Sequence, residues 1–97
     1  MKENLINFIK DFENGLAKDF NKTNSWQDIG YYNYCLGMKK TCMSAKTLIN
    51  NTKVKDLMSV LKQEQNKINT DDYEGIERDY YSGVYNMYRY ILMEMEK

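Results

Sequence analysis

The stretch that decides the fold runs from Asp71 to Met95 and reads DDYEGIERDYYSGVYNMYRYILMEM. Apolar and aromatic residues recur in it at steps of three, four or seven positions: Tyr73, Tyr80, Val84, Met87, Tyr88, Ile91 and Met95. This spacing predicts one continuous apolar face on a long helix. A second row lies a quarter-turn round the axis and consists of Tyr81, Tyr85, Tyr88 and Leu92. The apolar arc is then about twice as wide as one neighbouring helix can cover.

Two shorter amphipathic segments can pack against this helix. The first, from about residue 3 to 20, carries Leu5, Phe8, Ile9, Phe12, Leu16 and Phe20 on one face. The second, from about residue 53 to 68, has a narrow apolar row made of Val54, Leu57, Met58, Leu61 and Ile68. Polar, asparagine-containing turns end both patterns.

A second long helix is predicted from about residue 25 to 49. Ser25 and Asp28 indicate its start, although Gly30 also permits a start near Tyr31. Its first apolar stripe contains Tyr31, Cys35, Met38, Cys42, Ala45 and Ile49. Its second stripe, on another side of the helix, contains Ile29, Tyr32, Leu36 and Met43. A helix with two apolar sides either sits between neighbours or leaves one stripe for another chain.

These segments predict an all-α protein folded as an antiparallel four-helix bundle. The two long helices are expected at about residues 25–49 and 71–96, and the two shorter ones at about 3–20 and 53–68. Short connections favour antiparallel neighbours. The chain is 42% hydrophobic and 29% charged, with no proline and five glycines, which argues against disorder and against a turn-rich β-sandwich. We expect a single helical domain over residues 1–97.

The charges are balanced overall but unevenly distributed. Fourteen basic residues match fourteen acidic ones, so a general electrostatic attraction to nucleic acid or to an anionic membrane is not indicated. Residues 39–67 carry seven lysines against two acids, and residues 68–97 carry seven acids against three basic residues. The two regions either neutralise each other within the bundle or form a bipolar surface that docks on a charged partner.

The cysteines and the absence of a membrane-spanning run indicate a cytoplasmic protein. Cys35 and Cys42 would lie on one helix face about 10 Å apart, too far for a disulfide. They are interpreted as small buried residues in a reducing compartment. No apolar run approaches membrane-spanning length, so no membrane association is expected.

The sequence offers little for catalysis. It contains no histidine, which removes the usual general base and the commonest metal ligand. Two cysteines alone cannot make a zinc site, and no phosphate-binding glycine motif is present. The one carboxylate cluster contains Asp71, Asp72, Glu74, Glu77 and Asp79, and we interpret it as helix-start and solvated residues that could steer a basic partner. We therefore expect no enzyme activity, no metal and no cofactor.

The nine tyrosines suggest recognition of another protein. Tyrosine combines a large contact area with a low entropy cost and is enriched in interface hot spots. Alternatively, the rings simply cover the bundle. The two rows that exceed the needs of a four-helix core are the predicted partner-binding residues: Tyr81, Tyr85, Tyr88, Leu92, Ile29, Tyr32, Leu36 and Met43. Another protein is the expected partner, and self-association is also open.

Composition narrows the expected role. Abundant Asn, Lys, Tyr and Ile without Pro or His indicates an AT-rich genome, such as that of a low-GC bacterium or its phage. Small helical proteins of this kind without motifs often bind and block another protein. We expect a phage or mobile-element inhibitor of a host defence protein, similar to anti-CRISPR proteins, that acts by covering a surface.

Two alternatives remain at this stage. In length and helix layout the whole chain resembles the bacteriocin immunity proteins, which are small antiparallel four-helix bundles, and this resemblance implies an immunity function. A small DNA-binding regulator is the other alternative, because lysines in segment 39–67 could contact phosphates. Nucleic acid is the less favoured partner because the net charge is zero.

Overall fold

The structure is a computed structural model that describes residues 1–22 and 29–97. For residues 19–22 it describes the backbone alone. The described chain forms four α-helices: α1 (Lys2–Lys22), α2 (Ile29–Asn51), α3 (Leu57–Asn66) and α4 (Gly75–Met95). Two short 3-10 turns, η1 (Val54–Asp56) and η2 (Thr70–Asp72), precede α3 and α4. The predicted helix start at Ser25 and Asp28 lies outside the described residues.

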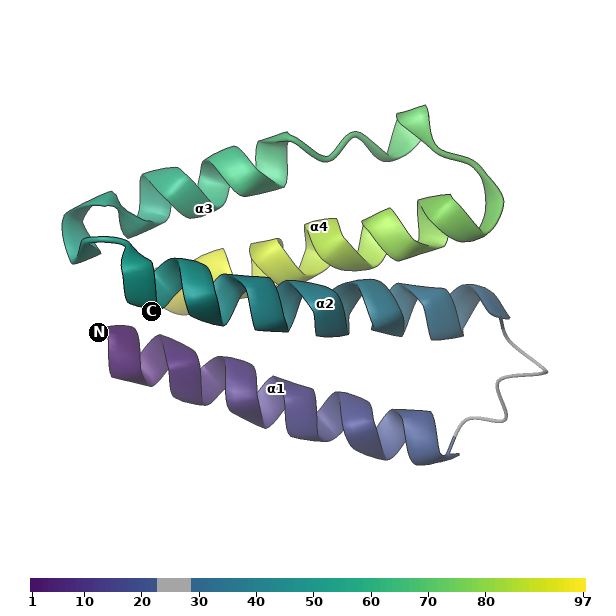
Figure 1. Ribbon diagram of the computed structural model, residues 1–97, viewed down its shortest axis with the longest axis horizontal. Coiled ribbons are helices and arrows are strands. Elements are labelled where there is room, and N and C mark those ends of the chain that lie inside the picture. Colours follow the sequence, from purple (N-terminus) through teal and green to yellow (C-terminus); the bar gives the residue numbers. More distant parts are fainter. Residues whose placement is uncertain (23–28) are drawn as a thin grey trace.

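The bundle is built round α2 and α4, which share its most extensive helix–helix contact. Figure 1 shows that these two helices run in the same direction, whereas consecutive helices run in opposite directions. Helix α1 packs on α2 and also contacts α4, and α3 packs on α4. The prediction of an all-α, four-helix bundle is confirmed, with antiparallel consecutive helices and a parallel central pair.

Two glycines allow α2 and α4 to approach each other backbone to backbone. A Cβ atom added at Gly37 would overlap the carbonyl of Tyr80, and one added at Gly83 would overlap the carbonyl of Tyr34. The two positions therefore require residues without a side chain, and each glycine lies against the backbone of the opposite helix. This contact fixes the crossing point of the central pair.

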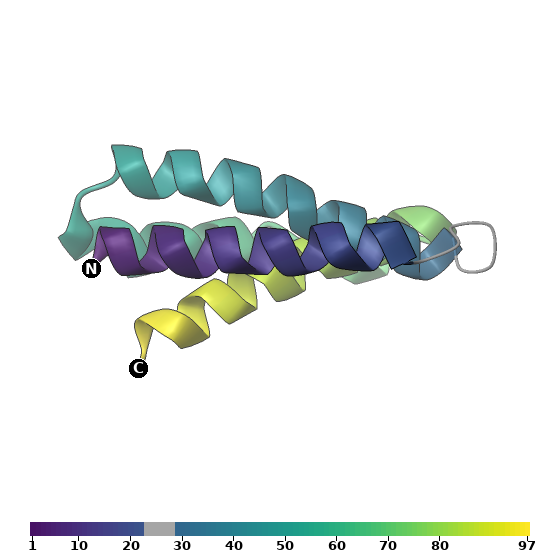
Figure 2. The same cartoon turned by 90° about the horizontal axis from the view of Figure 1, so that it is seen from below.

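From that crossing the central helices diverge toward their C-terminal ends, as Figure 2 shows. Larger side chains fill the wider part of the bundle. Residues fully buried there come from all four helices and are Ile9, Cys42, Ile49, Leu57, Leu61, Met87 and Ile91. Burying each of the larger ones contributes about 1.5–3 kcal/mol, which makes this cluster the main source of stability.

The last helix begins later than the predicted position of residue 71. Residues Thr70–Asp72 form the turn η2, whose backbone is capped by the Asn69 side chain, an acceptor for the Asp71 N–H at 3.1 Å. Helix α4 then begins at Gly75, where φ is +59°. Glycine adopts this left-handed conformation without the strain that a side chain would cause. At the other end of the chain, α1 has 21 residues and is as long as α4.

Candidate protein-binding surface

Two of the eight predicted partner-binding residues belong to the core. Tyr88 and Leu92 are only 7% and 8% exposed. Helix α3 packs against α4 on this side, and the pKa of Tyr88 is raised first by burial and then by the charge of Glu64 on α3. From the sequence, the row on α4 was expected to exceed what the core could bury, because the spacing of residues in α4 does not show how much of that helix α3 covers. Placing these two side chains on an exposed surface was wrong.

The remaining α4 residues of that row lie at the surface near the start of the helix. Tyr81 is half-buried and stacks on Tyr73, with ring centroids 3.9 Å apart and ring planes inclined by 18°. Tyr80 meets Tyr81 edge-on at 5.2 Å. Tyr85 is 37% exposed and borders a hollow of about 490 Å³ beside the connection from α3 to η2. The start of α4 thus presents an ordered group of aromatic rings.

Carboxylates surround this aromatic group. Asp71, Asp72, Glu74 and Glu77 are exposed, while Asp79 is half-buried. Arg78 reaches Asp71 only loosely, with Nη2 and Oδ1 3.7 Å apart. The pKa of Tyr73 is raised by loss of solvent, then by its contact with Tyr81, and further by the charges of Asp72 and Glu77. Of these carboxylates, Asp72 and Glu77 are therefore the ones whose charges reach Tyr73.

We call this region the acidic tyrosine surface. It consists of Tyr73 and Tyr81 together with Asp71, Asp72, Glu74 and Glu77. Sequence reasoning found the carboxylates and Tyr81 but assigned Tyr73 to the core-facing stripe. The stacking of Tyr73 depends on the turn η2, which the sequence pattern did not reveal.

The second predicted row lies on the outward side of α2, away from α4. Ile29 and Met43 are 52% and 53% exposed, Tyr32 is 37% exposed and Leu36 is half-buried. We call these four residues the α2 row. A hollow of about 270 Å³, lined by Asn33 of α2 and by Ile76, Glu77, Tyr80 and Tyr81 of α4, lies between this row and the acidic tyrosine surface.

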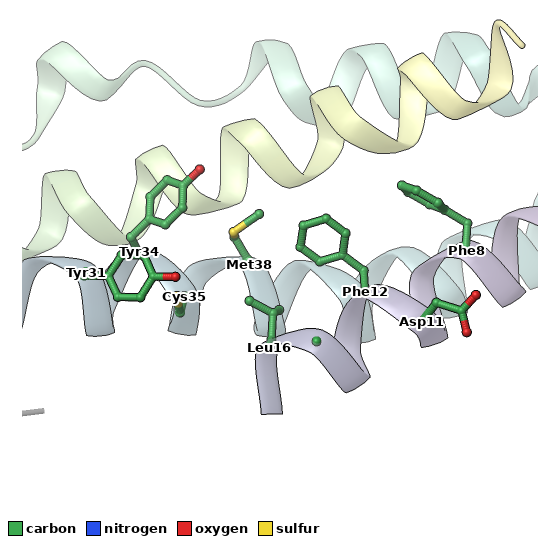
Figure 3. A pocket seen from close by; sticks show the side chains of 9 residues that line it. Phe8, Asp11, Phe12, Leu16, Tyr31, Tyr34, Cys35 and Met38 are labelled. Atoms are coloured by element: carbon green, nitrogen blue, oxygen red, sulfur yellow. The ribbon is translucent and has the colours of Figure 1, made fainter. Parts of the chain in front are cut away.

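An apolar pocket of about 440 Å³ lies between α1 and α2 (Figure 3). Its lining is mostly aromatic and aliphatic: Phe8, Asp11, Phe12, Gly15, Leu16, Tyr31, Tyr34, Cys35 and Met38. Tyr31 and Tyr34 stand at one end of the pocket and Phe8 and Phe12 at the other, with Met38 between them. Sequence reasoning missed this pocket, because Gly15 and the two phenylalanines were assigned simply to a core-facing helix.

Among the side chains that the structure describes, in residues 1–18 and 29–97, no three His, Cys, Asp or Glu side chains are placed to hold a metal ion. Cys35 and Cys42 are free and buried, and burial raises the pKa of Cys42 to about 12. The Cys42 thiol is therefore not positioned to act as a nucleophile near neutral pH.

Searches against known proteins return no matching family model, no matching curated protein and no matching solved structure. Among the helices of the described chain, none is long and apolar enough to cross a membrane.

Proposed function

We propose that this protein is a non-enzymatic binding module whose acidic tyrosine surface docks on a basic surface of another protein. The observation that supports the proposal is the stacked Tyr73–Tyr81 pair, with exposed carboxylates on both sides of Tyr73 in the chain. Tyrosine rings offer a large contact area and hydroxyl groups for hydrogen bonds, which makes them frequent anchors at interfaces.

The geometry suits recognition because the rings are already ordered. Each ring holds the other, and Tyr80 supports Tyr81 from the side. Little side-chain entropy is then lost on binding. The carboxylates Asp72 and Glu74 attract a basic partner before contact, which raises the association rate more than the final affinity. Binding should therefore weaken as salt concentration rises.

The specific role that we propose is inhibition of a host defence protein by a phage or mobile-element protein. Defence proteins that act on nucleic acid carry basic surfaces to hold the phosphates. An acidic surface with aromatic anchors complements such a patch and, once bound, denies it to the nucleic acid. An AT-rich composition supports a source in a low-GC bacterium or its phage.

The experiment compares phage plaquing on a defended bacterial strain that expresses one of three forms of the protein. The test variant is Asp72→Lys/Glu74→Lys, and the control is Glu3→Lys/Glu96→Lys, which makes the same change in net charge at exposed residues at the opposite end of the bundle from the start of α4 (Figure 1). We expect wild type and control to restore plaquing and to capture the defence protein, and the test variant to do neither.

Wild-type protein that leaves plaquing unchanged but protects the strain from a bacteriocin would replace this role with immunity. A test variant as active as the control would show that the acidic tyrosine surface is not the binding site.

A further inference from the structure

Three residues of the α2 row, Ile29, Leu36 and Met43, are spaced symmetrically along the helix. Ile29 precedes Leu36 by seven residues and Met43 follows it by seven, so each lies about 10 Å from Leu36 along the axis. Seven residues are nearly two full turns, and Ile29 and Met43 therefore share one side of α2 with Leu36. If two such helices lie antiparallel with their Leu36 residues facing each other, Ile29 of each meets Met43 of the other.

In the described part of the chain, this side of α2 carries the exposed side chains of Ile29 and Met43, with the half-buried Leu36 between them. Gly37, on a different side of α2, lies against the backbone of α4, and Cys42 lies in the core. By contrast, Ile29 and Met43 each leave about half of their surface in solvent. A row of apolar side chains on an uncovered helix face is the pattern by which helices associate.

Charge favours the antiparallel orientation. Glu77 lines the hollow that contains Asn33, three residues before Leu36, so it flanks the first half of the α2 row. Lys40, four residues after Leu36, is exposed on the second half. The antiparallel arrangement brings Glu77 of one copy beside Lys40 of the other, and does so twice. Because the net charge is zero, no overall repulsion opposes association.

We propose that the α2 row binds the α2 row of a second copy, antiparallel and centred on Leu36, to form a symmetric homodimer. The interface is isologous, so every contact occurs twice. One helix face buries less than the roughly 800 Å² per partner of a standard interface, so we expect a weak dimer that forms at high protein concentration. Glu77 also belongs to the acidic tyrosine surface, but self-association is measured without any other protein, so this inference does not rest on the proposed function.

Sedimentation over a concentration range of about 1 to 500 µM tests the dimer directly. Wild type should change from the mass of one chain, 11.6 kDa, to twice that value. Leu36→Glu and, separately, the more exposed Met43→Glu should each weaken association by about 100-fold, because each places paired like charges in the contact. Far-UV circular dichroism checks that both variants fold. Wild type that stays monomeric throughout would overturn the proposal.

Cysteine cross-linking tests the orientation. In Leu36→Cys the two new thiols face each other across the symmetry axis and should form a covalent dimer on mild oxidation. Asn50→Cys is the control, because Asn50 is exposed on α2 but lies about 21 Å from Leu36, which separates the two thiols by about 42 Å in an antiparallel pair. The buried native thiols of Cys35 and Cys42 do not compete. Equal cross-linking of both variants, or none with Leu36→Cys, would contradict the antiparallel arrangement.

Charge exchange tests the predicted pair. Lys40→Glu and Glu77→Lys should each weaken the dimer by about 10-fold, since each places like charges together. The double variant Lys40→Glu/Glu77→Lys should recover most of the lost affinity. If the double variant instead shows the product of the two single losses of dimer affinity, the two residues do not meet across the interface.

Discussion

Gly37 of α2 and Gly83 of α4 face each other across the central helix pair, and each lies against the opposite backbone. Gly37 fits beside the carbonyl of Tyr80, and Gly83 beside the carbonyl of Tyr34. The two helices run in the same direction and are separated by α3 in the sequence. This reciprocal contact, rather than pairing of consecutive helices, organises the bundle.

The first prediction follows from this contact. Gly37→Ala and Gly83→Ala each force a methyl group into backbone atoms that cannot rotate away. We expect each to reduce the free energy of unfolding by about 2–3 kcal/mol, the cost of overpacking a core. Urea denaturation followed by circular dichroism measures the change. A loss below 0.5 kcal/mol, the scatter of about ±0.5 kcal/mol common to surface substitutions, would show that α2 and α4 are not in backbone contact.

The second prediction is that Gly15→Ala stabilises the protein, in contrast to Gly37→Ala and Gly83→Ala. Gly15 lies within α1, and a Cβ there would meet no atom within 4 Å. Alanine has the higher helix propensity, so we expect the free energy of unfolding to rise by up to about 1 kcal/mol. The same denaturation experiment measures it. Destabilisation by this substitution would mean that the space beside Gly15 in the apolar pocket is filled.

A hydrogen bond beside the central pair gives the third prediction. The Asn86 side-chain N–H donates to the Tyr34 hydroxyl oxygen at 2.9 Å, linking α4 to α2 in a partly buried position. Tyr34→Phe should lower the free energy of unfolding by about 1 kcal/mol. Tyr85→Phe, which removes an exposed hydroxyl, is the control and should leave stability unchanged. Equal effects of the two variants would argue against the Tyr34–Asn86 bond.

The fourth prediction concerns pH. Burial, and secondarily the charge of Glu13, raises the pKa of Cys42 from 9.0 to about 12. The folded state then keeps a proton that the unfolded state loses above its own pKa, so this contribution to stability is complete below pH 9 and is lost as pH rises toward 12. Tyrosines titrate in the same range. The measurement is therefore the difference in stability between wild type and Cys42→Ala as a function of pH.

That difference should be constant below pH 9 and should move in favour of Cys42→Ala at higher pH. Alkylation with iodoacetamide at pH 8.5 offers a second check, because Cys42 should react only after unfolding. A Cys42 that reacts at the same rate in folded and unfolded protein would contradict its burial.

Helix positions and core faces could be predicted well from the sequence, because apolar spacing depends on each helix alone. In the first stripe of α2, the five residues from Cys35 to Ile49 are all buried, as expected. Exposure of the α2 row was one of two alternatives left open by the sequence, because a helix with two apolar sides either sits between neighbours or leaves one stripe exposed.

The features that could not be predicted from the sequence depend on which helix lies opposite a given residue. Tyr88 and Leu92 were assigned to a surface because the position of α3 over them is a property of the assembled bundle. The importance of Gly37 and Gly83 was hidden for the same reason, since a glycine in a helical pattern indicates close approach only when its neighbour is known. The stacking of Tyr73 on Tyr81 depends on η2 and on the left-handed Gly75.

The two glycines also prevent α2 and α4 from sliding along each other. If α4 moved along α2 by one turn, residues with side chains would replace Gly37 and Gly83 at the crossing, and their Cβ atoms would collide with the opposite backbone. A partner bound at the start of α4 therefore cannot push that helix lengthwise to signal to the far end of the bundle. If the proposed binding takes place, α2 and α4 should keep their relative position, with slow amide exchange round the crossing that changes little on binding.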